Sequence, residues 1–360
     1  MTKIKSAVIG CGRMGAFTSV SVKKYSPKCW LPLNHVEALI ACPNTDLVSI
    51  CDLNSKVLNK VKSQYDIENQ FEDYIKMLEV IKPELLCIAT RAIERSNIIK
   101  DAINYGVKAV HLEKPICNSI KQLNDLSKLV NDNNIALTYG TLRRYFDIYA
   151  KAKEIAESGR LGDLQEIEVS FGPAQLFWGQ PHSVDIILFF AGLRNITSVK
   201  ASLSNVVLGE DNDLISSDPQ VDAAKIFFDD GCVGSITTKV GMDVTLHCSR
   251  GRIIVEGDGR RVVVRKLNNS MAYFEYPDEV IKEGDRQEGT MAAIERLVDQ
   301  LRPSKNASNS AKIFDQKHIF LGQLVLFGFA QSHLDGGVSV ALNEIRSTIH
   351  VLGKTGSLFA

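Results

Sequence analysis

A short apolar run that ends in a glycine-rich turn constrains this chain more than any other stretch. Residues 5–9 have the pattern of a buried strand, and residues 16–17 can open a helix. The turn between them reads Gly10-Cys11-Gly12-Arg13-Met14-Gly15. In this order the first glycine permits a tight turn, the second lets backbone approach a pyrophosphate, and the third allows close helix–strand packing. We therefore predict a dinucleotide site formed by all six residues, with a ligand-free glycine turn as the alternative.

An acidic residue, Asp52, ends the second apolar run at residues 47–51. A carboxylate here accepts hydrogen bonds from ribose hydroxyls and repels a 2′-phosphate, so NAD is predicted in preference to NADP. Asp52 follows the turn by more than the usual 20 or so residues. The extra length falls at residues 19–33, which contain two prolines, Trp30 and three lysines. We expect an inserted surface loop there, with a flap beside the cofactor or an interface segment as the alternative.

Strand and helix signals alternate as far as residue 140. Helix signals near 54–64, 72–80, 94–105 and 119–132 separate apolar runs at 85–90, 107–112 and 135–140. Apolar runs of this length are typical of parallel strands with both faces covered. The pattern predicts an α/β Rossmann domain with a doubly wound parallel sheet over residues 1–140.

The run at 107–112 leads into a charged motif, Glu113-Lys114-Pro115. Ligands of open α/β sheets bind beyond the carboxyl ends of the strands, so Lys114 is placed to reach reacting groups. Pro115 has no N–H and ends strand pairing. An isolated motif of this kind is explained equally well by a solvated charge pair before a turn. Its position in a dinucleotide-binding domain makes Lys114 a candidate catalytic residue.

Composition excludes several classes of protein. Lys+Arg and Asp+Glu both number 42, so no global field attracts nucleic acid or an anionic membrane. No apolar stretch is long enough to cross a bilayer. The eight cysteines form no Cys-x-x-Cys pair, which argues against structural zinc or a disulfide framework. We expect a cytoplasmic protein without a bound metal.

Strand signals dominate the second half of the chain. They cover 164–171, 197–208, 221–229, 232–240, 243–248, 252–256 and 261–266. Turns rich in Asp and Gly at 229–231 and 256–259 indicate hairpins. We predict an α+β domain over 141–360 with a large open, mostly antiparallel sheet. Helices are expected at 147–158, after residue 180 and near the C-terminus, where they carry His318, His333 and His350; residues 305–310 read as a polar linker.

Several motifs taken together resemble one family. The glycine turn, Asp52, Thr90 and the Glu-Lys-Pro motif occur in order on the expected strands. They are followed by Tyr139-Gly140-x-x-Arg143-Arg144-Tyr145 and Ser158-Gly159-Arg160-Leu161-Gly162. The set is similar to the glucose-fructose oxidoreductase, inositol dehydrogenase and rhizopine catabolism (Gfo/Idh/MocA) family over nearly the whole chain. It is strongest to residue 171 and again in a final helix expected at 342–353.

This resemblance implies an NAD-dependent oxidoreductase acting on the CH–OH group of a sugar, cyclitol or sugar derivative, nucleotide sugars included. It implies cofactor contacts from the glycine turn, Asp52, Thr90, Glu113 and Lys114, and a cis Lys114–Pro115 bond. It also implies that helices cover one face of the second sheet and that the other face pairs between subunits. We therefore expect a homodimer or homotetramer.

The family pattern Asp-x-x-x-His-x-x-Asp falls on residues 178–185. His182 and Asp185 match its last two positions, whereas Trp178 stands where the first aspartate is expected. We predict that His182 exchanges the proton, because its ordinary pKa lies near neutrality, and that Lys114 holds and polarises the reacting oxygen. Asp185 either orients His182 or caps the helix. Trp178 and His182 are expected to contact substrate. Because Trp178 replaces the expected aspartate, the identity of the substrate alcohol and the assignment of the catalytic base both stay open.

Three arginines lie near the expected cleft. Arg144 is predicted to bind substrate, with a salt bridge across the domain interface as an equal alternative. Arg91 and Arg95 follow Thr90, and a solvated helix start is favoured for them over recognition of a phosphate or carboxylate. The alternative function is an NAD-binding sensor that has lost catalysis, for which Trp178 is the one supporting feature.

Overall fold

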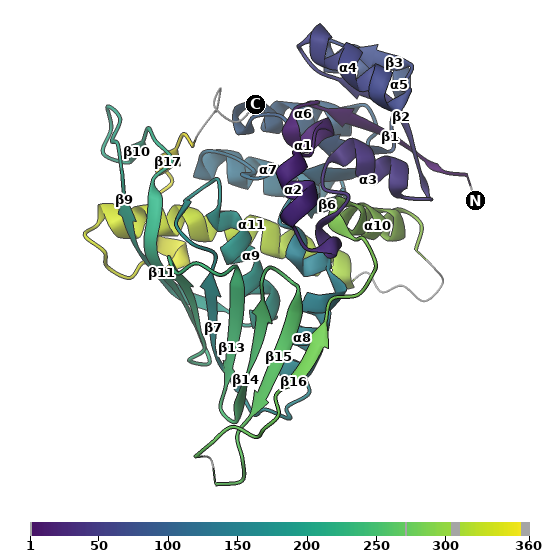
Figure 1. Ribbon diagram of the computed structural model, residues 1–360. Coiled ribbons are helices and arrows are strands. Elements are labelled where there is room, and N and C mark those ends of the chain that lie inside the picture. Colours follow the sequence, from purple (N-terminus) through teal and green to yellow (C-terminus); the bar gives the residue numbers. More distant parts are fainter. Residues whose placement is uncertain (1, 271, 304–309, 354–360) are drawn as a thin grey trace.

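The computed structural model describes residues 2–270, 272–303 and 310–353. A layered α/β part, built mostly from the first 140 residues, occupies one end of the molecule, and a large sheet occupies the other (Figure 1). Helices from the second half of the chain lie between the two sheets (Figure 1). One cluster of buried apolar side chains runs from the first sheet into the second, so the two parts share a core.

The first sheet has six parallel strands in the order β3-β2-β1-β4-β5-β6. Its strands are β1 (Ile4–Ile9), β2 (Thr45–Cys51), β3 (Asn69–Phe71), β4 (Leu85–Ile88), β5 (Ala109–Leu112) and β6 (Ala136–Tyr139). The strand order reverses direction between β1 and β4, which is the point where open α/β sheets bind ligands. The predicted doubly wound Rossmann sheet is confirmed.

Local signals account for the helices around this sheet. They are α1 (Arg13–Ala16), α2 (Val20–Tyr25), η1 (Lys28–Trp30), α3 (His35–Ala41), α4 (Ser55–Tyr65), α5 (Tyr74–Ile81), α6 (Ala92–Asn104) and α7 (Ile120–Asp132). The side chains of Asn34, Asn54, Asp73 and Ser119 each accept a hydrogen bond from a backbone N–H of the first turn of α3, α4, α5 and α7. Such caps satisfy donors that have no partner inside the helix.

The insertion at 19–33 differs from the expected surface loop. It contains α2 and the 3-10 turn η1, and it bridges the two parts of the molecule. Lys28 N donates to Glu283 Oε2 at 3.0 Å, and Arg260 Nη2 donates to the Tyr25 carbonyl at 2.7 Å. Both partners lie more than 230 positions away in the chain, so the local pattern of the insertion gave no sign of them.

The second sheet has nine strands in the order β16-β15-β14-β13-β7-β12-β11-β8, with β9 also paired to β11. Its bounds are β7 (Leu164–Ser170), β8 (Ala174–Gln175), β9 (Ile196–Ser204), β11 (Gln220–Phe228), β12 (Val233–Thr237), β13 (Asp243–Cys248), β14 (Gly251–Glu256), β15 (Arg261–Lys266) and β16 (Glu279–Lys282). All pairs are antiparallel except β7–β12. The predicted mostly antiparallel sheet and both hairpins are confirmed. β8 and β16 were missed because strands of two and four residues carry little periodicity.

Helices α8 (Asp147–Glu157), α9 (Gln180–Ala191) and α11 (Ser310–Leu334) contact the second sheet. Helix α10 (Gly289–Leu301) behaves differently. Its residues Ile294, Leu297 and Val298 belong to the apolar cluster of the first sheet, and the helix contacts β5, β6 and α3. The domain boundary at residue 140 stays a prediction. Helix α10, which comes much later in the chain, packs against the first sheet.

The final helix expected at 342–353 is wrong. A 3-10 turn, η3 (Leu342–Glu344), is followed by β17 (His350–Val351), which pairs in parallel with β10 (Leu214–Ile215). Val351 N also donates to the Asn118 carbonyl, so distant partners override the local helix pattern. His350 therefore lies on a strand, while His318 and His333 lie on α11 as expected. Residues 305–309 of the expected linker lie outside the described residues, and no helix of the described chain is long and apolar enough to span a membrane.

Candidate active site

The glycine turn joins β1 to α1 at the point where the strand order reverses. Gly10 has φ 89°, and a Cβ added there would lie 2.8 Å from the Ala89 carbonyl carbon. A Cβ on Gly15 would lie 1.9 Å from Gly10 O. These two glycines are therefore required by the packing of the protein itself. A Cβ on Gly12 would meet nothing within 4 Å, which leaves the close approach that a pyrophosphate needs.

Asp52 is tied to this turn. Its Oδ2 accepts a hydrogen bond from Cys11 N at 2.8 Å, and its Oδ1 accepts one from Asn54 N at 2.9 Å. The half-buried carboxylate is thereby held at the end of β2, beside the glycine turn. The residues present fit a dinucleotide: an open glycine for the pyrophosphate and a fixed acceptor for ribose hydroxyls.

Lys114 lies just past the end of β5, and its bond to Pro115 is cis, as the resemblance implied. Its Nζ donates to the Trp178 carbonyl at 2.9 Å and lies 3.7 Å from the centre of the Trp178 indole. The guanidinium of Arg13, in the glycine turn, lies 5.4 Å from the same ring. Burial, reinforced by the charges of Arg95 and Arg13 and opposed by Glu113, lowers the pKa of Lys114 to about 8.

Glu113 faces the protein interior next to Lys114. Its Oε1 lies 3.2 Å from His35 Nε2, and Gly140 leaves room for the carboxylate, since a Cβ there would be 2.8 Å from Glu113 Oε2. Burial alone would raise the pKa of Glu113, but His35 and Lys114 lower it to about 2. Ligand atoms of His35, His111 and Glu113 lie within 4.8 Å of one another. The hydrogen bond from His35 already occupies the carboxylate, and His35 itself was missed because only the fold brings α3 against β5.

His182 lies in the first turn of α9 and is half-buried. Its Nδ1 has no hydrogen-bond partner among the described residues. Burial, and then the positive charges of Arg143 and Lys114, lowers the pKa of His182 well below its ordinary value. Those charges reach His182 from η2 (Leu142–Tyr145) and from the end of β5. The fold therefore brings the two predicted catalytic side chains close enough for the charge of Lys114 to act on His182.

Asp185 and Arg144 form a buried ion pair. Arg144 Nε donates to Asp185 Oδ2 at 2.9 Å, Nη2 lies 2.9 Å from Oδ1, and Nη2 also lies 3.2 Å from His318 Nδ1. The Arg144 side chain is 1% exposed. These contacts support the salt bridge that the sequence left as an equal alternative, and substrate binding by Arg144 stays a prediction.

Arg95 corrects the expectation of a solvated helix start. It is 4% exposed, and it donates to the carbonyls of Pro115 and Thr90. The guanidinium thus joins the loops after β4 and β5, on which the Glu-Lys-Pro motif and Thr90 lie. Arg91 is exposed, as a solvated helix start requires.

Comparison with known proteins adds to this geometry. Residues 4–141 match the model of an oxidoreductase family with an NAD-binding Rossmann fold, GFO_IDH_MocA. This match covers the first domain of the chain, which is similar to the NAD-binding domain of that family. The first curated relatives are matched over less than two thirds of their own length.

Two curated proteins and one solved structure are similar to this chain. D-apiose dehydrogenase of Rhizobium rhizogenes is 24% identical over 63% of this chain and 65% of its own. Myo-inositol 2-dehydrogenase of Thermotoga maritima is 22% identical over 72% and 70%. A crystal structure of an inositol dehydrogenase homologue from Azotobacter vinelandii, complexed with NADH and myo-inositol, superposes with a TM-score of 0.72 at 14% identity, covering 94% and 98%. The last likeness shows a shared fold.

Arg143 belongs to one of the motifs that resemble the Gfo/Idh/MocA family, but the sequence analysis assigned it no role. Its Nε donates to Asp258 Oδ1 at 2.7 Å, and its guanidinium carbon lies 4.7 Å from the Trp30 ring and 4.1 Å from the Phe171 ring. Trp30 and Asp258 reach it from the insertion and from the β14–β15 turn. The double-arginine motif was visible in the sequence, but nothing local distinguished its two members.

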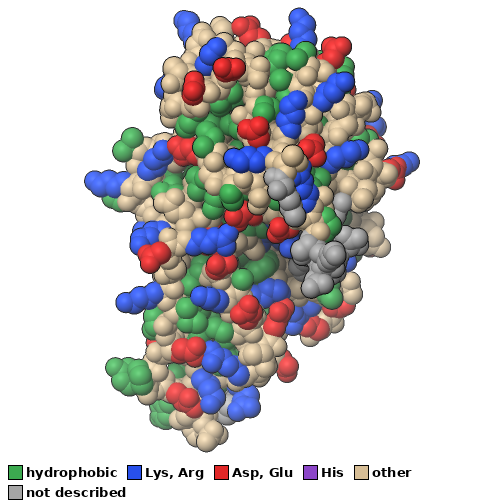
Figure 2. All heavy atoms as spheres, turned by 90° about the vertical axis from the view of Figure 1, so that its right-hand side faces the viewer, with side chains coloured by type: hydrophobic (Ala, Val, Ile, Leu, Met, Phe, Trp, Pro, Cys, Tyr) green, Lys and Arg blue, Asp and Glu red, His purple; other side chains and the backbone are tan. Residues whose placement is uncertain are grey.

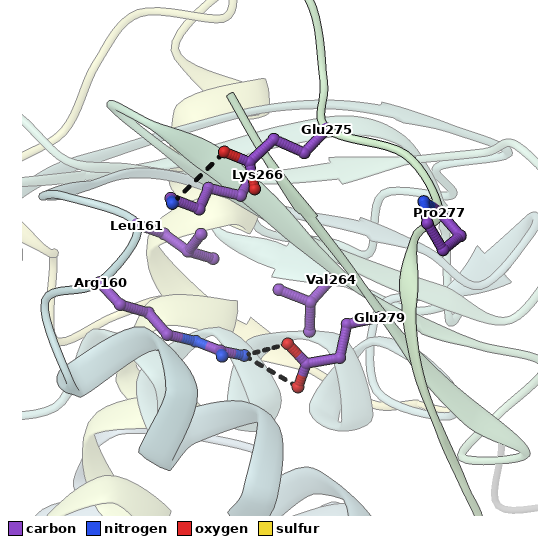
Figure 3. A pocket seen from close by; sticks show the side chains of 7 residues that line it. All are labelled: Arg160, Leu161, Val264, Lys266, Glu275, Pro277 and Glu279. Atoms are coloured by element: carbon purple, nitrogen blue, oxygen red, sulfur yellow. Dashed lines mark hydrogen bonds and ion pairs between the residues drawn. The ribbon is translucent and has the colours of Figure 1, made fainter. Parts of the chain in front are cut away.

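A cavity of about 250 Å³ lies beside β15 and β16 of the second sheet, away from the candidate active site. Figure 3 shows its lining, in which Arg160 points toward Glu279 and Lys266 toward Glu275. None of the predicted site residues of the Gfo/Idh/MocA pattern lines it. Lys/Arg and Asp/Glu side chains are interspersed on the face seen in Figure 2, without a large area of one sign, so that face has no patch suited to nucleic acid.

Proposed function

We propose that this protein transfers a hydride between NAD and a carbinol or keto group of a sugar, a cyclitol or a sugar derivative. The observation that carries the proposal is the convergence of Lys114 and His182. One has a pKa brought near neutrality, and the other has a buried ring nitrogen without a partner. Lys114 lies in the domain that contains the glycine turn, and His182 reaches it from α9 of the second part of the chain. A proton-transferring group beside a hydride acceptor is what oxidation of a carbinol requires.

The pKa shifts support an exchange of the two roles expected from the sequence. The pKa of Lys114, about 8, lies closer to a neutral operating pH than that of His182, which burial holds far below 6.5. We assign proton exchange to Lys114 and let neutral His182 bind the reacting hydroxyl. NAD, when bound, supplies the hydride acceptor. In the direction of reduction the lysine returns the proton.

The cofactor assignment rests on Asp52. Its carboxylate is fixed by the Cys11 and Asn54 N–H groups and would lie near a 2′-phosphate, whose charge it would repel. NAD is therefore the proposed cofactor, and NADP is disfavoured. The buried, unpaired state of all eight cysteines suits a reducing compartment, and we place the protein in the cytoplasm.

We also propose that the open face of the second sheet pairs with a second copy, giving a homodimer or homotetramer. Its strands alternate buried residues with residues that are half-buried or exposed, such as Glu168, His247 and Arg252. A sheet face left open to solvent is commonly covered by a partner. Light scattering on the purified protein tests this, and a strictly monomeric mass would contradict it.

The test of function is NADH formation across a panel of sugars, inositols and sugar acids. Wild type should turn over at least one class, and Lys114→Ala should reduce kcat at least a hundredfold. Lys121→Ala is a surface control, because Lys121 forms an exposed ion pair with Asp125 on α7. Tight NAD binding without turnover of any compound would favour the sensor alternative instead.

A further inference from the structure

Arg143 is a buried cation near His182, and one of its donors has no partner among the described residues. The residue is 4% exposed, and its Nη1 has no hydrogen-bond partner among the described residues. Leaving a buried donor unpaired is unfavourable, and more so when the group is charged. After burial, the charge of Arg143 does most to lower the pKa of His182. The unpaired nitrogen therefore lies near the proposed reacting groups.

The guanidinium is held in place from three sides. Asp258 accepts from Nε at 2.7 Å, and the rings of Trp30 and Phe171 lie against the guanidinium plane at 4.7 and 4.1 Å. Trp30 Nε1 in turn donates to the Asp258 carbonyl at 3.0 Å, so the insertion fixes both Arg143 and its counter-ion. The faces of both aromatic rings attract the desolvated cation. A donor that is both immobilised and unpaired is preorganised for a ligand.

The positive charges near Trp178 indicate which chemical group this ligand carries. Lys114 and Arg13 place positive charge 3.7 and 5.4 Å from the centre of the Trp178 ring, and Trp178 itself carries no charge. A single free guanidinium nitrogen satisfies one oxygen of a carboxylate, whereas a phosphate needs several donors for its three oxygens.

We propose that Arg143 determines specificity by binding a carboxylate of the substrate, so that the substrate is a sugar acid, and that the insertion serves to hold Arg143 for this purpose. The inference rests on the proposed function, because it names the substrate class of the same site. Arg143 takes the substrate-binding role that the sequence assigned to Arg144.

Isothermal titration of the full-length protein, saturated with NADH, tests the proposal directly. The probes are sodium D-glucuronate and D-galacturonate, their neutral counterparts D-glucose and D-galactose, and D-glucose 6-phosphate. Wild type should bind the two acids at least tenfold more tightly than the neutral sugars and the phosphate. Equal or weaker binding of the acids overturns the proposal, and preference for the phosphate overturns the choice of carboxylate.

Two variants assign the effect to Arg143. Arg143→Gln should remove the preference for acids and leave NADH affinity unchanged, and Arg143→Lys, which keeps the charge, provides the test if the first variant does not fold. Arg252→Gln is the matched control, because Arg252 lies 4.9 Å from the Phe274 ring on the second sheet. An acid preference that survives in both Arg143 variants contradicts the proposal.

Trp30 is a positioning residue in this scheme. Trp30→Leu should raise KM for the acid at least fivefold with little change in kcat, and Trp30→Phe should restore KM. A fall in kcat with unchanged KM would contradict the role of the insertion.

Turnover of neutral sugars that is insensitive to Arg143 would contradict this inference while leaving the proposed function intact. Arg143-dependent binding of acids without turnover of any compound would contradict the proposed function while leaving this inference intact.

Discussion

The ammonium of Lys114 lies 3.7 Å from the centre of the Trp178 indole and donates a hydrogen bond to the carbonyl of the same residue. The side chain that replaces the expected aspartate is thus in direct contact with the candidate catalytic lysine. A desolvated contact of this kind stabilises the charged amine by about 0.5–2 kcal/mol. It opposes the burial that lowers the pKa of Lys114, and it places an aromatic face where a sugar ring can stack.

We expect Trp178 to act on substrate binding more than on the chemical step. Trp178→Ala should raise KM for the preferred substrate about tenfold, because the stacking surface is lost, while kcat changes less than threefold. Trp178→Phe should retain most of the affinity. Steady-state kinetics separate these effects, and a large loss of kcat at constant KM would contradict this role.

Asp52 should determine the choice between NAD and NADP. Asp52→Ser removes the acceptor for the ribose hydroxyls and the repulsion of a 2′-phosphate, so the ratio of NAD to NADP affinity should fall at least tenfold. Asp46→Ser, at an exposed position on the same strand, is the control. Fluorescence titration with NADH and NADPH measures both constants. An unchanged ratio would show that Asp52 does not face the ribose.

Proton exchange by Lys114 predicts a specific pH dependence. Its pKa is lowered to about 8, so the neutral amine that accepts a proton is scarce at pH 6 and predominates above pH 9. The value of kcat/KM for substrate oxidation should therefore rise through about pH 8 and then level off, and that for reduction should fall over the same range. A profile governed only by a group titrating below pH 6.5 would instead identify His182 as the base.

The Arg144–Asp185 pair should be important for stability. Removing one partner leaves a buried charge unpaired, which costs about 3–5 kcal/mol. Asp185→Asn and Arg144→Met should each lower the free energy of unfolding by several kcal/mol, and the double variant should lose less than the sum of the two. Urea unfolding at pH 7 measures all three. Normal stability in Arg144→Met, with a raised KM for substrate, would restore Arg144 as the substrate-binding residue.

Much of the first domain could be predicted because its signals are local. The apolar runs, the glycine turn and the capping residues each act within a few positions, and the positions of Asp52, Thr90 and Lys114 follow from the ends of the strands. The second sheet was predicted in class but not in detail, since β8 and β16 are too short to show a period. The expected final helix failed because β17 is determined by its pairing with β10, more than 130 positions away.

The sequence by itself determined the glycine turn and the alternation of strands and helices in the first domain, because backbone conformation depends on local patterns. Its position in that domain made Lys114 a candidate, whereas His182 became one through the family resemblance. Only the tertiary structure decided how these groups are used. Burial brought the pKa of Lys114 near 8, Trp178 came to rest on its ammonium, and Asp258 paired with Arg143 across 115 positions. Charge interactions act through space and depend on desolvation, so partners distant in sequence, and not neighbours along the chain, assign each residue its role.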